Sequence, residues 1–166
     1  MLTALAILAL LTALSVPAYG AFLGFYRLHS EAQMLGWALQ LARSEAIKRN
    51  VRVNVCKSVD RVHCATTGSG FETGWLIHAD PGRTGQPDAD DPPIRIEPPA
   101  PDGITIHGNK PVANLVSYTA FGHPRELNGA LQMGTFTLCR SGFNAVHVVL
   151  ANSGRIRIEN TSDSCP

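Results

Sequence analysis

No charged side chain precedes Arg27, and the residues before it form one apolar run, MLTALAILALLTALSVPAYGAFLGFY. About 20 apolar residues are enough to span a bilayer as a helix, and a helix tolerates Pro17, Gly20 and Gly24 there. A segment of this kind has to lie in lipid or against other helices. The run therefore restricts the fold more than any other feature of the chain.

A retained membrane anchor and a cleaved secretory signal are the two interpretations of this run. It lacks the positively charged start of a signal peptide, and its apolar character continues through Phe22, Phe25 and Tyr26, beyond a candidate cleavage site at residues 18–20. We favour the anchor, with an exported soluble domain as an alternative. Both interpretations place the rest of the chain outside the cytoplasm. The residues expected to contact lipid or neighbouring helices are Leu2, Leu5, Ile7, Leu8, Leu11, Leu14, Pro17, Phe22 and Phe25.

The apolar run continues into an amphipathic segment. Apolar residues recur there at steps of three and four, at Leu28, Ala32, Leu35, Leu39, Ala42 and Ala46. This period predicts a helix with one buried stripe, and Lys48 and Arg49 suit its C-terminal end. We expect one helix from Met1 to about Arg49, roughly 70 Å long at 1.5 Å per residue.

After Asn50 the sequence changes to short β-type runs separated by turn residues. The expected strands are 51–55, 74–78, 94–97, 104–107, 115–118, 134–139, 145–150 and 155–159. They predict a sandwich or bent sheets, with Trp75, Phe136 and Phe143 in the core. Residues 80–102, rich in Pro, Gly and Asp, are expected to form a flexible surface loop. The expected units are therefore 1–26, 27–50 and a globular β domain at 51–166.

The chain has four cysteines, Cys56, Cys64, Cys139 and Cys165. An even count in an exported domain indicates disulfides, with three possible pairings. We favour Cys56 with Cys64, which closes a short loop, and Cys139 with Cys165, which ties the tail to an earlier strand. Zinc is the alternative, but neither pair has CxxC spacing and no HxxxH accompanies them. We expect no metal and no cofactor.

Charge and motifs argue against several classes of function. The net charge is only +1 and the pI is about 7.8, so any binding of anions has to come from a local patch. The six histidines form no metal-spaced pair, and the chain contains no GxSxG, HExxH or nucleotide-binding glycine loop. An enzyme is not expected.

Five segments together resemble the FimT/GspH family, the minor pilins and pseudopilins of type IV pili and type II secretion systems. They are ARSEAIKR at 42–49, VNVC at 53–56, GWLI at 74–77, GTFTLC at 134–139 and GRIR at 154–157. The resemblance covers nearly the whole chain. It implies an α+β pilin-like fold, in which a long N-terminal helix packs on an antiparallel β domain. It also implies partnership with other pilins or pseudopilins through that helix.

One departure from the family concerns the start of the chain. Family members begin with a short basic leader, a glycine cleavage site and a glutamate ahead of the apolar run, whereas this sequence starts inside the run. We expect Met1 to be a mis-assigned or truncated start. In that case prepilin peptidase would be a further partner.

The resemblance also bears on the C-terminal residues. FimT-type members that serve DNA uptake carry a Gly-Arg-x-Arg motif, which Gly154, Arg155, Ile156 and Arg157 match. Two arginines on one side of a strand would lie about 7 Å apart, close to the phosphate spacing of a nucleic-acid strand. Lys110, Arg125 and Arg140 would widen this patch if the fold brings them near. The plain alternative is a solvated strand face, which Glu159 and Asp163 help to neutralise.

These features predict a single-pass inner-membrane protein whose β domain faces the periplasm before it joins a pilus or pseudopilus. The favoured function is a minor type IV pilin that binds double-stranded DNA without sequence preference for natural transformation. The alternative is a GspH-like minor pseudopilin with a structural role at the tip of a type II secretion pseudopilus.

Overall fold

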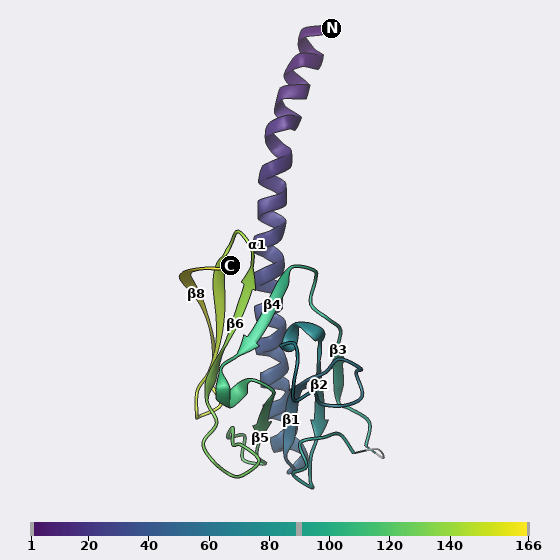
Figure 1. Ribbon diagram of the computed structural model, residues 1–166, viewed down its shortest axis with the longest axis vertical. Helices are drawn as coiled ribbons and strands as arrows, with labels where there is room; N and C mark the ends of the chain where they lie inside the picture. Colours follow the sequence, from purple (N-terminus) through teal and green to yellow (C-terminus); the bar gives the residue numbers. More distant parts are fainter. Residues whose placement is uncertain (1, 89–90, 166) are drawn as a thin grey trace.

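The computed structural model describes residues 2–88 and 91–165, and within its helix the side chains of residues 3, 20 and 22–49. A single long helix, α1 (Leu2–Arg49), projects from a β domain (Figure 1). The predicted lipid-facing residues from Leu2 to Pro17 fall outside the described side chains. In the described part of the chain, no helix meets the length and hydropathy needed to cross a membrane.

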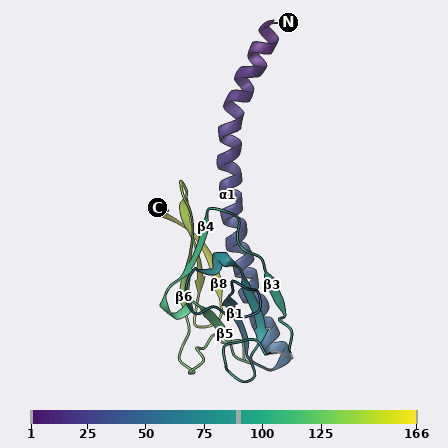
Figure 2. The ribbon, with the colours of Figure 1, turned by 45° about the vertical axis from the view of Figure 1, so that its right-hand side comes forward.

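The second half of α1 packs on the β domain, and its first half extends beyond it, as Figure 2 also shows. All members of the predicted apolar stripe are buried: Leu28, Ala32, Leu35, Leu39, Ala42 and Ala46. The helix ends at Arg49 because Asn50 adopts a left-handed conformation, with φ of 56°. The helical period therefore predicted the packed face correctly.

The β domain contains two four-stranded sheets in which all paired neighbours are antiparallel. Sheet A has the order β3 (Arg95–Glu97), β2 (Trp75–Ala79), β1 (Val53–Lys57) and β5 (Leu115–Tyr118). Sheet B has the order β4 (Ile104–Gly108), β6 (Gly134–Arg140), β7 (Asn144–Leu150) and β8 (Ile156–Ser164). Two short 3-10 helices are η1 (Phe71–Thr73) and η2 (Lys110–Val112). Each predicted strand has a counterpart, and the α+β pilin-like prediction is confirmed.

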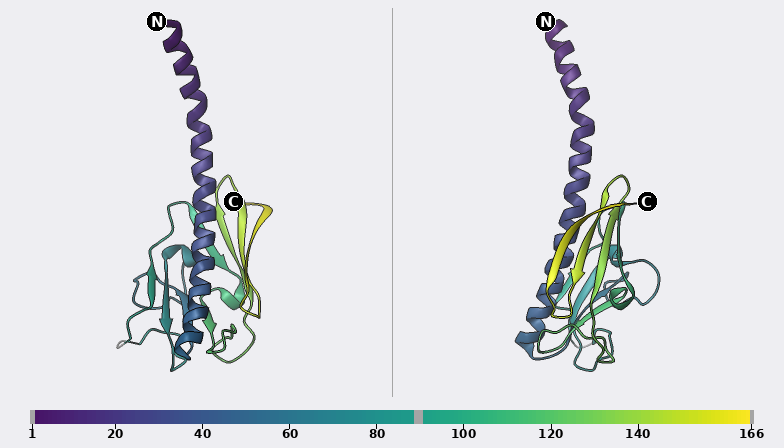
Figure 3. Two further views of the ribbon diagram at one scale, coloured as in Figure 1. Left: turned by 180° about the vertical axis from the view of Figure 1, so that it is seen from behind. Right: turned by 90° about the vertical axis from the view of Figure 1, so that its left-hand side faces the viewer.

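The core lies where α1 crosses the boundary between the two sheets (Figure 3). Trp75 from sheet A and Phe136 from sheet B are both buried in it, as predicted. The ring of Phe71 meets the ring of Phe136 edge to face, with 5.1 Å between the centroids. Phe143 is only half-buried and packs at the margin of the core, beside Gly24 of α1.

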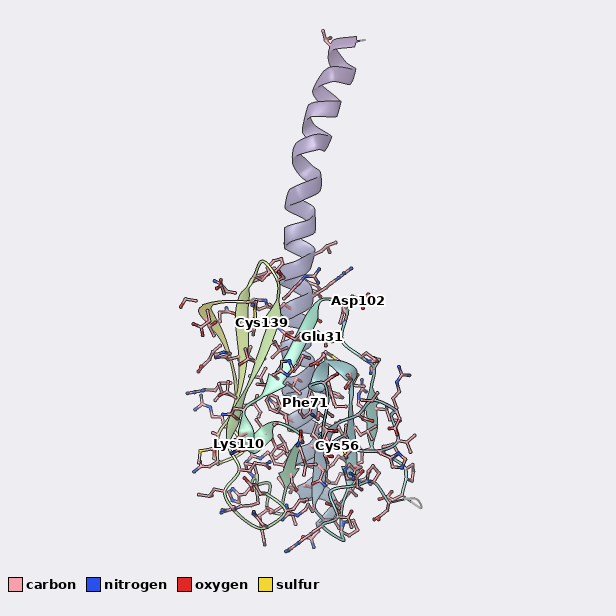
Figure 4. The ribbon with its side chains drawn as sticks, viewed as in Figure 1. Glu31, Cys56, Phe71, Asp102, Lys110 and Cys139 are labelled. Carbon is pink, nitrogen blue, oxygen red and sulfur yellow. A yellow bond between two sulfur atoms is a disulfide. The ribbon has the colours of Figure 1, made fainter. Side chains whose placement is uncertain are left out.

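Two disulfides brace the domain and join the cysteine pairs that the sequence favours. Cys56 is bonded to Cys64 and Cys139 to Cys165, with Cα atoms 5.5 Å and 5.4 Å apart. The first closes the loop that follows β1. The second ties the end of β8 to β6, near the end of sheet B from which α1 projects (Figure 4).

The predicted surface loop at 80–102 is wrong at its start, because Asp80 is buried. The Asp80 carboxylate accepts hydrogen bonds from the Asn54 side chain at 2.7 Å and from the backbone amides of Thr84 and Gly85 at 2.8 Å and 3.0 Å. These bonds replace the water that the carboxylate loses on burial. Further along the same segment, β3 adds an edge strand to sheet A.

His78 is buried on β2, beside the Cys56–Cys64 disulfide. Its Nε2 lies 3.4 Å from the Sγ of Cys64, and its Nδ1 lies 3.0 Å from the carbonyl oxygen of Ala79. The Sγ atoms of Cys56 and Cys64 and a ring nitrogen of His78 lie within 4.8 Å of one another, but the disulfide occupies both sulfurs. Burial lowers the pKa of His78, while the backbone of Ala79 and the charge of Asp80 oppose that shift.

This lowered pKa makes stability depend on pH. An unfolded chain protonates His78 at its ordinary pKa of about 6.5, whereas the folded chain keeps it neutral to a lower pH. The free energy of unfolding should therefore fall as pH drops below about 6.5, by at most roughly 1.4 kcal/mol per pH unit from this residue. Urea unfolding at pH 7 and pH 5 would measure the loss, which His78→Gln should reduce. Equal losses in wild type and variant would contradict this origin.

Candidate nucleic-acid interface

The Gly-Arg-x-Arg residues begin where the β7–β8 hairpin turns. The amide of Gly154 donates to the carbonyl of Ala151 at 2.9 Å, and the amide of Ala151 donates to the carbonyl of Arg155 at 2.9 Å. Gly154 has φ of 80°, and a Cβ atom there would lie 2.8 Å from the carbonyl oxygen of Gly122. Glycine is therefore required at this turn, both by the left-handed backbone and by the close approach of Gly122.

Arg155 and Arg157 are both exposed, and Ile156 between them is half-buried against the core. The side chains of Ile156 and Ile158 lie over Gly36 of α1, where a Cβ atom would meet them at ordinary van der Waals distances, so β8 packs directly against the helix. The alternation of exposed and packed positions follows the period of a strand. The two arginines therefore project from the same solvent-facing side of the hairpin, and their positions on the strand are about 7 Å apart.

Arg157 forms an ion pair with a neighbouring glutamate. Its Nη2 lies 3.1 Å from a carboxylate oxygen of Glu159, two residues further along β8, and both side chains are about half exposed. Exposed ion pairs of this kind contribute less than about 1 kcal/mol and weaken with salt. Among the described residues Arg155 forms no ion pair. The hairpin therefore carries one unpaired cation and one weakly paired cation.

Two residues expected to widen the patch lie in different parts of sheet B. Gly134, at the start of β6, pairs with Leu150 of β7, and Leu150 pairs with Ile156 of the hairpin. Arg140 lies at the other end of β6, six residues from Gly134. That places Arg140 about 20 Å from the hairpin along the strands, next to Cys139 in Figure 4. The fold therefore does not bring Arg140 near the arginine pair, because strand register places them at opposite ends of sheet B.

Lys110 lies in η2, directly after β4 and towards the same end of sheet B as the hairpin (Figure 4). Two strands separate β4 from β8, so Lys110 lies about 14 Å from the arginine pair, measured across the sheet. Arg125 is half-buried, and its carbonyl accepts a hydrogen bond from Arg52 at 3.0 Å. Lys110 can therefore contact an anion only at a second point, apart from the arginine pair.

Arg43 positions the hairpin, a role that the sequence did not indicate. Its guanidinium donates to the carbonyl of Gly154 at 3.2 Å, although the two residues are far apart in the chain. Arg43 belongs to the ARSEAIKR segment, which the sequence marked only as a family feature. The same guanidinium lies beside Gly122, in a turn after β5. No spacing in the sequence could have joined these three segments.

Residues 31–154 match the family model described as type II transport protein GspH. The chain belongs to this family. The match ends at Gly154, so Arg155 and Arg157 lie beyond it and family membership alone does not assign them a role. No curated protein sequence matches the chain significantly.

Solved structures of a minor pilin and a minor pseudopilin have a similar architecture. A crystal structure of the type IV minor pilin FimU of Pseudomonas aeruginosa is similar with a TM-score of 0.63 and 22% identity, over 82% of this chain and 93% of that one. The minor pseudopilin EpsH from the type II secretion system of Vibrio cholerae is similar with a TM-score of 0.54 and 13% identity, over 82% and 99%. At these sequence identities, the likeness shows that this chain has the same fold as the two solved structures.

Proposed function

We propose that this GspH-family chain is a minor pilin of a type IV pilus that also binds DNA outside the cell. Its β domain faces the periplasm while the first half of α1 is held in the inner membrane, and this half then packs against other pilins in the filament. The arginine pair binds DNA without sequence preference through the phosphate backbone. Processing by prepilin peptidase would require the leader that family members carry.

The observation that carries the DNA-binding role is the exposure of Arg155 and Arg157 on a fixed hairpin at the end of the domain opposite the N-terminus. Gly154 and its hydrogen bond from Arg43 hold this hairpin in place. Two guanidinium groups at strand spacing can each donate to a phosphate. Their position leaves the helix free for assembly contacts.

The assembly role is supported by the outward face of α1. Phe22, Phe25 and Tyr26 are exposed on the part of the helix that leaves the β domain. Aromatic side chains suit the membrane boundary and also helix–helix contacts. Exposed aromatic groups at this point fit a helix that is covered by lipid before assembly and by neighbouring subunits afterwards.

A minor pseudopilin of a type II secretion system is the second candidate. The description of the family model favours it, and so does the Arg157–Glu159 ion pair, which is the arrangement expected of a solvated strand face. In that function the hairpin has no nucleic-acid ligand, and the domain acts only through contacts with other subunits.

Anisotropy titration with labelled duplex DNA separates the two candidates. The full chain in a non-ionic detergent is compared with Arg155→Ala/Arg157→Ala and with Arg27→Ala/Arg61→Ala. The control pair removes the same charge from two exposed arginines outside the hairpin. We expect the first variant to lose at least about tenfold in affinity and its salt slope to fall by roughly 2.

The control variant should bind like wild type apart from a small general effect of charge. Equal losses in the two variants would show that net charge rather than the hairpin attracts DNA. If wild type fails to bind at low salt, the DNA-binding role is refuted and the pseudopilin function is favoured.

A further inference from the structure

A second feature lies beside the hairpin, at the end of the domain opposite the N-terminus. It is a hollow of about 350 Å³ between the residues that follow α1, the segment after Asp80 and the turn at 119–123. We call it the end hollow. Its volume lies at the lower limit of small-molecule sites. It is large enough for one nucleotide and too small for a longer ligand to enter whole.

The end hollow is lined by two arginines. Arg52 is only 8% exposed, and its guanidinium donates to the Ser117 hydroxyl at 2.7 Å. Arg83 is exposed and forms no ion pair among the described residues. Burial lowers the pKa of Arg52 and the nearby charge of Arg83 lowers it further, while the charge of Asp80 opposes that shift. None of the described lining residues is acidic, and the nearby Asp80 carboxylate is already hydrogen-bonded to the Asn54 side chain and two backbone amides. The two arginines therefore border a space that an anion can fill.

An exposed aromatic ring stands at the rim of the end hollow. Phe121 is 84% exposed, although phenylalanine normally avoids water. The turn that carries it is held by hydrogen bonds from the amide of Thr119 to the carbonyl of His123 at 3.0 Å and from the amide of Gly122 to the carbonyl of Thr119 at 2.8 Å. The ring is therefore presented by a defined turn and offers a face for stacking.

The end hollow and the arginine pair adjoin the same turn. Gly122 follows Phe121, and its carbonyl oxygen contacts Gly154, which precedes Arg155. The Arg43 guanidinium lies against both glycines. An unpaired strand that crosses this turn can therefore meet Arg155 on one side and Phe121 on the other.

We propose that the end hollow binds one nucleotide of single-stranded DNA, with its phosphate at Arg52 and Arg83 and its base stacked on Phe121. This inference rests on the proposed DNA-binding function and adds to it a preference for DNA with unpaired bases over duplex. Positive charge that follows the backbone, combined with an aromatic platform, is the usual way in which proteins hold single strands. A base inside a duplex has both faces covered and cannot stack on Phe121.

Three labelled probes of one length test the inference with the full chain in detergent: oligothymidine, the same strand with abasic sites, and a duplex. The variants are Phe121→Ala, Phe121→Trp and Arg83→Ala. Phe121→Ala should weaken oligothymidine binding by about 5- to 150-fold, the range for loss of one stacked base. Its affinity for the abasic strand and the duplex should stay within about twofold of wild type, because neither probe stacks on the ring.

Phe121→Trp should retain oligothymidine binding, since it keeps an aromatic face. Arg83→Ala should weaken oligothymidine and the abasic strand together and reduce the salt slope by about 1, because it removes a phosphate contact. Phe121→Ala that binds oligothymidine like wild type overturns the inference, and so does an equal loss on all three probes. In both cases duplex binding that still depends on Arg155 and Arg157 leaves the proposed function standing. If wild type binds none of the probes, the proposed function itself fails.

Discussion

We expect Phe136→Ala to lower the free energy of unfolding by about 3–5 kcal/mol, the usual range for truncation of a buried phenylalanine. Phe136 is fully buried in the centre of β6, and its ring meets that of Phe71 edge to face. Removing it leaves a cavity in the core cluster, to which α1 and strands of both sheets contribute. Because protein cores are closely packed, the neighbouring side chains cannot move far enough to fill the space.

Phe121→Ala is the matched control, because it removes the same atoms from a ring that is 84% exposed. We expect its free energy of unfolding to stay within about 0.5 kcal/mol of wild type. Urea or guanidinium unfolding, followed by tryptophan fluorescence, to which buried Trp75 and exposed Trp37 contribute, compares the two variants. Similar losses in both would mean that Phe136 is not in the core of the domain.

The second large effect is expected from Cys139→Ser/Cys165→Ser. The Cys139–Cys165 bond closes a chain segment with a sequence separation of 26, and loop-closure entropy predicts a loss of about 3.5 kcal/mol when it is removed. The Cys56–Cys64 bond spans a separation of only 8, so Cys56→Ser/Cys64→Ser should lose about 1 kcal/mol less. The longer loop leaves the unfolded chain more freedom once it is opened.

Unfolding of the oxidised wild type and the two variants measures this difference. Wild type with both bonds reduced should be less stable than either variant. Non-reducing peptide mapping supplies the control, since each variant should retain the other disulfide. A larger loss for the Cys56–Cys64 pair would show that native packing near His78, rather than loop length, dominates.

The sequence predicted the fold well because its signals are local. The three- and four-residue steps from Leu28 to Ala46 specify one buried helix face, and this face is the one that packs. Turn residues divide the β region into short runs, and every run became a strand. The predicted loop at 80–102 failed at Asp80, since burial of that carboxylate depends on Asn54, a residue on another strand.

The candidate site was predicted only in part, for a related reason. Arg155 and Arg157 belong to one short motif, so the sequence alone could mark them. Arg140 looked equally suitable until strand register placed it at the other end of sheet B. Phe121, Arg52 and Arg83 come from three segments of the chain, and no local pattern distinguishes them. Only the fold brings them to one hollow.

The placement of β8 beside α1 also has a mechanical consequence. A strand of DNA held at Arg155 would pull on the start of β8, along the strand axis and away from the N-terminus. Because the turn joins β7 to β8, both strands would be drawn together, and the hydrogen bonds between β6 and β7 would be loaded in shear and share the tension. The Cys139–Cys165 bond anchors the far end of β8 to β6. The hairpin is therefore placed so that it resists a pull along the strand axis.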